Sequence, residues 1–99
     1  MSKHEEDAMK DFIWIDRQEL LRLSKAQGFK ATGIAMELIS AWAENAYAPL
    51  PGDAESLAAL LRSAGEGWLE DARPFFVTLP DGRLVPSPSL ISLTDPYTE

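Results

Sequence analysis

The sequence predicts an α+β domain that is mainly helical, with three to four helices followed by a C-terminal β-hairpin. Three observations support this fold class. Apolar residues recur with the period of an amphipathic helix in the middle of the chain. Caps and helix stops divide that middle part into separate helices. A Pro-Asp-Gly turn near the C-terminus lies between two short runs of strand composition.

The first expected elements are a short strand and a helix. The run Phe12–Ile15 is apolar throughout and bounded by polar residues, which favours a buried strand. Asp16 and Glu19 have the spacing of a capping box, so a helix is expected to begin at Asp16. Gly28 is expected in the loop that follows this helix.

The strongest helical signal covers residues 33–46, with Thr32 as the expected N-cap. One stripe of this helix is apolar and the opposite stripe is polar, as in a half-buried helix. The apolar stripe consists of Ile34, Leu38 and Trp42, and the polar one of Glu37, Ser40 and Glu44. Prolines at positions 49 and 51 are expected to end the helix.

Two shorter helices and a hairpin complete the expected domain. Asp53 caps a helix over residues 54–63, and a further helix covers residues 66–72. Strands over 75–79 and 83–85 flank the Pro-Asp-Gly turn. This order is the layout of a winged helix-turn-helix domain, and the N-terminal strand could join the hairpin as a third strand.

We expect a domain over residues 12–86, with a flexible N-terminal tail over 1–11 and an extended or flexible C-terminal tail over 87–99. Within that second tail, the apolar side chains of Leu90, Ile91 and Leu93 are expected to dock on the body. The three tryptophans, Trp14, Trp42 and Trp68, lie in apolar patterns and are expected in the core, whereas an exposed tryptophan would be a candidate interface anchor.

The composition argues against an enzyme and against any cofactor or metal. The chain has no cysteine and a single histidine, His4, which lies in the expected N-terminal tail. Catalytic triads and zinc sites therefore lack their ligands and bases. The charged N-terminus does not resemble a signal peptide, and no apolar run approaches the ~20 residues of a membrane span. A cytoplasmic protein that does not contact a membrane is expected.

The charge is unevenly distributed. Residues 1–30 hold six basic and six acidic side chains, whereas residues 31–99 hold three and ten. An acidic face can attract a basic protein, although a solvated surface is the alternative explanation. The candidate partner-binding residues are Asp53, Glu55, Glu66, Glu70, Asp71 and Asp81.

DNA is the alternative partner. The recognition helix would cover either residues 66–72 or residues 54–63. Neither of these helices, nor the turn of the hairpin, carries enough cations for the several phosphate contacts that DNA binding requires. DNA binding would need a homodimer that pools its charge, or a basic patch around the first helix formed by Arg17, Arg22, Lys25 and Lys30.

A family resemblance supports the same architecture. It is carried by Leu23-Ser24, Gly33, Trp42, the loop 49–53, Leu57-Ala58, Leu60, Trp68, Phe75-Phe76 and residues 81–84. On these residues the chain resembles the DUF1376-type (YdaU-like) proteins of phages and prophages. The resemblance implies a winged-helix-like body of phage origin, and the chain departs from the family pattern in extra residues over about 25–32.

The charge and the resemblance together lead to one functional expectation. The chain is expected to be a small acidic phage protein that binds, and modulates or inhibits, a host or phage nucleic-acid-processing protein. A defence or transcription complex in the bacterial cytoplasm would suit this role, because such machines carry basic channels. The alternative is a winged-helix accessory protein that binds DNA in replication or transcription.

Overall fold

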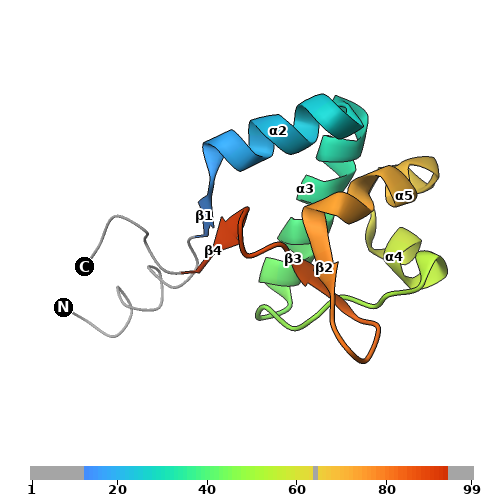
Figure 1. Ribbon diagram of the computed structural model, residues 1–99. Helices are drawn as coiled ribbons and strands as arrows, with labels where there is room; N and C mark the ends of the chain where they lie inside the picture. The colour runs from blue at the N-terminus through green and yellow to red at the C-terminus, as the bar shows by residue number, and fades with distance from the viewer. Residues whose placement is uncertain (1–12, 64, 94–99) are drawn as a thin grey trace.

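The computed structural model describes residues 13–63 and 65–93, and the fold is α+β and mainly helical, as the sequence predicted (Figure 1). The expected tail over 1–11, Phe12 and His4 lie outside the described residues. The elements in chain order are β1 (Trp14–Ile15), α2 (Arg17–Gln27), α3 (Phe29–Glu44), α4 (Ala54–Leu60), the 3-10 turn η1 (Glu66–Trp68), α5 (Leu69–Ala72), the 3-10 turn η2 (Arg73–Phe75), β2 (Phe76–Thr78), β3 (Leu84–Pro86) and β4 (Ile91–Ser92).

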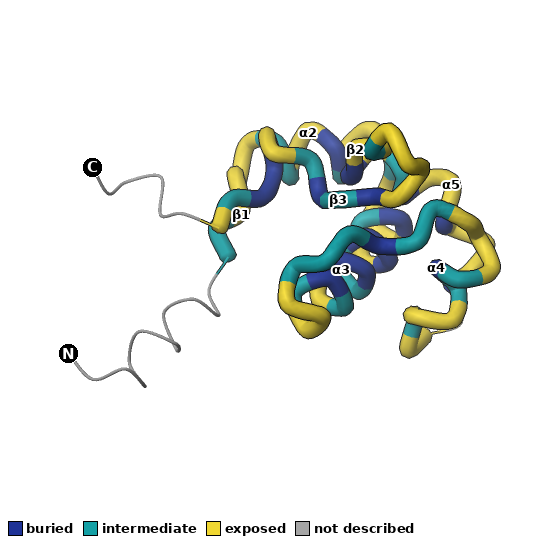
Figure 2. Tube along the Cα trace, turned by 90° about the horizontal axis from the view of Figure 1, so that it is seen from below, coloured by how far each residue is buried: buried dark blue, intermediate teal, exposed yellow. Residues whose placement is uncertain are grey.

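The central element is α3, against which α2, α4 and α5 all pack. The predicted apolar stripe is confirmed, since α3 buries Ala31, Ile34, Ala35, Leu38, Ile39 and Trp42. Figure 2 shows this helix as mainly buried or intermediate, while the outer side of α4 is exposed. Leu57 from α4, Leu69 from α5 and the fully enclosed Phe75 complete the core around it.

The start of α3 differs from the prediction. The helix begins at Phe29, and the single residue Gly28 separates it from α2. Gly28 has φ +89°, a conformation that a glycine adopts without steric cost, so the chain turns a corner there. Thr32 is therefore no N-cap: its hydroxyl donates to the Gly28 carbonyl at 2.8 Å from inside the helix.

The end of α3 is also earlier than the expected residue 46. Ala46 and Tyr47 have positive φ values of 55° and 64°, so the helix cannot continue through them. The Tyr47 N–H donates to the Trp42 carbonyl at 2.9 Å, and the two rings meet edge to face with centroids 5.1 Å apart. These contacts offset the unfavourable backbone conformation.

The predicted hairpin is confirmed. Strands β2 and β3 are antiparallel, with Val77 opposite Val85, and residues 80–82 form the turn. On the other edge of β3, Leu84 exchanges backbone hydrogen bonds of 2.7 and 2.8 Å with Leu50. Leu50, in the segment between α3 and α4, therefore pairs with β3 of the hairpin through a single β-bridge.

The N-terminal strand does not join the hairpin, which corrects the expectation of a third strand. Strand β1 pairs with β4 in a separate antiparallel ribbon, with Trp14 opposite Ser92 and Ile15 opposite Ile91. Trp14 is only half-buried. Alternating or apolar composition marks a strand but does not specify which edge it pairs with.

The segment 87–93 is part of the body, which corrects the described part of the expected C-terminal tail. Leu90 and Ile91 are buried, as predicted for docking, but Leu93 is 49% exposed and does not dock. The Asp16 N–H donates to the Leu90 carbonyl at 2.8 Å, which ties this segment to the start of α2.

Leu90→Ala should therefore lower the free energy of unfolding by about 2–5 kcal/mol, because Leu90 is only 1% exposed and its truncation leaves a cavity. Leu93→Ala is the matched control and should change stability by less than about 0.5 kcal/mol. Urea denaturation followed by circular dichroism measures both. Equal effects would contradict the docking of residues 87–93.

Candidate functional site

Three of the six predicted acidic residues serve the fold itself. Asp53 is the N-cap of α4, and its carboxylate accepts the Ser56 N–H at 2.9 Å. Glu70 accepts a hydrogen bond from the Arg73 guanidinium at 3.0 Å. Asp81 accepts the backbone N–H of Arg83 at 3.0 Å and its guanidinium at 2.7 Å. The Ser56 hydroxyl and then the Ser56 N–H lower the pKa of Asp53, and the N–H and then the guanidinium of Arg83 lower the pKa of Asp81.

The other three acidic residues, Glu55, Glu66 and Asp71, are exposed. None of them has an ion pair with a cation of the described residues. Two of them, Glu66 and Asp71, lie at the ends of the short segment 66–71, which belongs to η1 and α5 and exposes these side chains while Leu69 packs into the core. The negative charge available to a partner is therefore concentrated on that segment and on the first turn of α4.

Most arginines in residues 13–63 and 65–93 are paired within the molecule. The carboxylate partners of Arg22, Arg62 and Arg83 are Glu19, Glu44 and Asp81 at 2.7 to 3.3 Å. Arg73 bridges two elements, since it donates to Glu70 in α5 and to the Gly52 carbonyl before α4, both at 3.0 Å. The charge of each of these arginines is therefore partly offset by a neighbouring carboxylate.

The predicted basic patch is dispersed. Arg22 makes two hydrogen bonds of 2.7 and 2.8 Å to Glu19, which neutralise it. Arg17 and Lys25 are exposed and unpaired among the described residues, but they occupy opposite ends of α2, about 12 Å apart along its axis. Lys30 lies beyond the Gly28 corner and contacts Trp68 instead.

Glu37 on α3 holds the loop that follows α4. Its carboxylate accepts the Arg62 N–H at 2.9 Å, the Ser63 N–H at 3.3 Å and the Ser63 hydroxyl. The hydroxyl of Ser63 and then the Arg62 N–H keep the pKa of Glu37 below its usual range. This loop begins at residue 61, so α4 ends at Leu60 and not at the predicted residue 63.

An aromatic surface lies beside that loop. Trp68 in η1 is 39% exposed, and Phe29 at the start of α3 is 82% exposed. Both line a hollow of about 350 Å³, together with Gly33 and Gly65. The ammonium group of Lys30 lies 5.4 Å from the centre of the Trp68 ring. The expectation that Trp68 belongs to the core was therefore wrong.

Sequence reasoning missed Phe29 because the helix was predicted to begin at residue 33, after Thr32 as the N-cap. Extending the helical period backward from the polar stripe, from Glu37 through Gly33, reaches Phe29 on the same exposed side. An aromatic residue on the polar stripe was the signal that could have revealed this surface. Leu60 at the end of α4 is another exposed apolar residue, at 37%.

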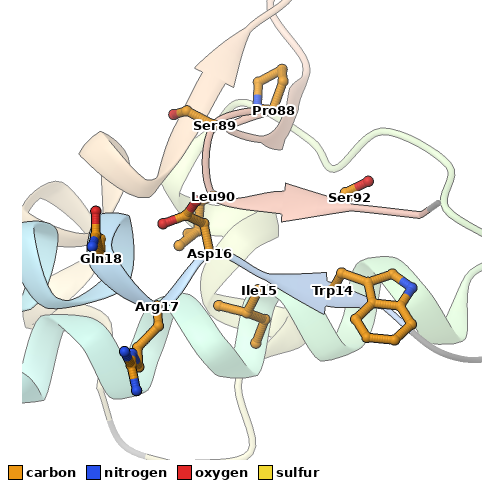
Figure 3. A pocket seen from close by; sticks show the side chains of 9 residues that line it. All are labelled: Trp14, Ile15, Asp16, Arg17, Gln18, Pro88, Ser89, Leu90 and Ser92. Carbon is orange, nitrogen blue, oxygen red and sulfur yellow. The ribbon is translucent and has the colours of Figure 1, made fainter. Parts of the chain in front are cut away.

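Another hollow, of about 510 Å³, lies beside the β1–β4 ribbon (Figure 3). Its polar groups are mostly engaged within the fold: Asp16 caps α2, and the Ser89 hydroxyl contacts Ser87 at 2.8 Å and Glu19 at 3.1 Å. Arg17 is the exposed charge on its border. This hollow therefore offers little chemistry for a ligand beyond one guanidinium.

Among the residues that the structure describes, no three acidic, histidine or cysteine side chains gather closely enough to hold a metal ion. No helix in the described ranges is sufficiently long and apolar to span a bilayer. Comparison of the chain with protein-family models, curated proteins and solved structures gives no match. The resemblance to the DUF1376-type family stays a prediction.

The lowered pKa of Glu37 predicts a pH-dependent contribution to stability. The folded state binds fewer protons than the unfolded state near the ordinary glutamate pKa of about 4.3, so this contribution is present above that value and disappears as the pH falls through the lowered pKa. Glu37→Gln should reduce the melting temperature at neutral pH, and the difference from the wild type should shrink at about pH 3.

Thermal melts followed by circular dichroism test this prediction. Glu55→Gln is the matched control, because Glu55 is exposed and accepts no hydrogen bond from another described residue. If Glu37→Gln lowered the melting temperature equally at both pH values, the proposed role of the Glu37 charge in stability would be contradicted.

Proposed function

We propose that this chain is a protein-binding module that docks on a positively charged protein through the exposed segment 66–71. The single observation that carries the proposal is that two carboxylates without an ion pair among the described residues flank an exposed tryptophan in the sequence. Glu66 and Asp71 have no ion pair among the described residues, and Trp68 lies between them. Tryptophan is a frequent anchor of protein interfaces, and acidic residues around it would favour a basic partner.

The arrangement of the body supports a winged-helix type of scaffold as part of this proposal. Three helices, α3, α4 and α5, precede the β2–β3 hairpin, and Leu50 between the first two pairs with β3. In such a scaffold the segment 66–71 would hold the place of the element that enters the DNA groove. Here that element carries three carboxylates and no cation.

Duplex DNA is a less suitable partner for this surface. Arg73, the cation that follows the segment, is held by Glu70 and the Gly52 carbonyl. Arg83 at the turn of the hairpin is held by Asp81. A protein that gains affinity from phosphate contacts needs several free cations, so repulsion is expected instead.

The partner class follows from the same charges. Proteins that process nucleic acids carry basic channels, and an acidic module can occupy such a channel and inhibit the machine. We propose a host or phage protein of this class, such as a defence or transcription complex. The family resemblance to phage proteins is consistent with this choice.

The proposal predicts that Glu66→Gln combined with Asp71→Asn removes binding. Capture of proteins from bacterial lysate by the immobilised chain, quantified by mass spectrometry, should drop at least about tenfold for proteins whose capture by the wild type decreases with salt. Ala26→Lys with Ser40→Lys is the matched control, because it changes the net charge by the same two units at exposed helical sites.

The control variant should retain most of the capture. Equal losses in both variants would mean that only the net charge matters, and unchanged capture by Glu66→Gln/Asp71→Asn would contradict the assignment of the segment. Circular dichroism spectra of all three proteins should coincide, since every substituted residue is exposed.

A gel-shift series with duplex DNA gives a separate prediction. The wild-type chain should not shift the duplex even at low ionic strength, where phosphate contacts are strongest. A complex with micromolar affinity or better at ordinary salt would contradict the proposed partner class and would favour a DNA-binding accessory protein.

A further inference from the structure

The exposed ring of Trp68 already holds a cation. The Lys30 ammonium lies over the ring, 5.4 Å from its centre, which is within the range of a cation–π interaction. Lys30 is exposed and has no ion pair with a carboxylate of the described residues. The face of the Trp68 ring therefore contacts a positive side chain that has no carboxylate counterion among the described residues.

The surroundings of the ring leave room for the side chain of a partner in place of Lys30. Gly33 has no side chain, and a Cβ atom built on it would meet no atom within 4 Å. Gly65 allows η1 to approach α3 closely, because a Cβ atom there would lie 2.0 Å from the Ile34 Cδ1 atom. Both glycines line the hollow, together with Phe29 and Trp68.

The charged residues that line the hollow are Lys30 and Glu37, and the Glu37 carboxylate is engaged by Arg62 and Ser63. Two further carboxylates are close to Trp68 in the sequence. Glu66 precedes Trp68 by two residues and Asp71 follows it by three, and both are exposed and unpaired within the described ranges. A cationic side chain of a partner would be attracted by these carboxylates and would meet an aromatic face at the end of its approach.

We propose that this hollow, which we call the Trp68 site, receives an arginine side chain of a basic partner protein, and that Lys30 occupies the Trp68 site in the free protein. The inference rests on the proposed function and specifies its chemistry. Arginine suits the Trp68 site better than lysine, since the planar guanidinium stacks on aromatic faces and is less strongly hydrated than an ammonium. Binding displaces the Lys30 ammonium from the ring.

Two peptides of equal charge test the Trp68 site. Hexa-arginine and hexalysine with capped ends are titrated into the full chain by isothermal calorimetry at low ionic strength. Both peptides experience the same long-range electrostatic attraction, so a difference between their affinities reports the short-range contact of a single side chain with the protein. Hexa-arginine should bind more tightly, by no more than about fivefold, the value of one whole exposed cation–π contact, because hexalysine can also place an ammonium on the ring but cannot stack a planar guanidinium there.

Substitutions of Trp68 localise that preference. Trp68→Leu should abolish the preference for hexa-arginine, and Trp68→Phe, which keeps an aromatic ring, should retain part of it. No preference in the wild-type chain would overturn the inference. A preference that persists in Trp68→Leu would also overturn it, because another residue would then be responsible.

Substitutions of lysine test the role of Lys30. Lys30→Gln should tighten the binding of hexa-arginine more than Lys25→Gln does. Both changes remove one positive charge, but only Lys30 contacts the ring. Equal tightening by the two variants would contradict the displacement of Lys30.

The variant Glu66→Gln/Asp71→Asn separates this inference from the proposed function. It should weaken both peptides alike and preserve their ratio, because it reduces attraction without altering the ring. Unchanged affinity of both peptides for this variant would overturn the proposed function alone. If the wild type shows no preference for hexa-arginine but the substitution of Glu66 and Asp71 still weakens both peptides, the Trp68 site alone would be overturned. If neither peptide binds to the wild type, both the Trp68 site and the proposed function would be overturned.

Discussion

The structure depends on the burial of one helix, α3, whose apolar side chains contact both the element that precedes it and elements that follow it in the sequence. Ala31 and Ala35 are completely buried, so neighbouring helices approach the α3 backbone closely. Leu38 and Ile39 are almost completely enclosed, and Phe75 from η2 lies in the same core cluster. Because α2, α4 and α5 all pack on α3, the position of each surface segment follows from its contact with this helix.

The exposed stripe of the same helix organises the candidate binding surface. Phe29 and Lys30 lie at its start, and Glu37 in its middle holds the loop before η1. That loop leads into η1, which places Trp68 beside Lys30. One side of α3 therefore contributes to the core, and its exposed side contributes to the aromatic hollow.

The arginines of the described residues illustrate how a small acidic protein uses its few cations. Arg62 and Arg83 neutralise nearby carboxylates, and Arg73 also ties α5 to the loop before α4. Exposed ion pairs of this kind contribute little to stability individually. Each pair also places a negative charge beside an arginine, which weakens the attraction of that arginine for a phosphate.

The sequence was sufficient where the signal is local. The Asp16 cap, the Asp53 cap and the turn at residues 80–82 each depend on residues within one turn of chain, and all three are present. The apolar stripe of α3 was equally predictable, because its period is independent of the partners that bury it.

Features set by distant contacts were not predictable. The pairing of β1 with β4 depends on which strand edge lies nearby, and composition does not encode that. The early end of α4 follows from Glu37, about 25 residues upstream along the chain. The exposure of Trp68 was missed because a large aromatic residue suits a core and an interface equally well.

The β1–β4 ribbon has a practical consequence for engineering. It brings residues 14 and 92 directly opposite each other, at the end of the body away from α4 and α5 (Figure 1). A circular permutant could join these neighbouring positions with a short linker and open the chain at the hairpin turn. Fusion partners or surface tethers attached at this end would leave the aromatic hollow accessible from solution.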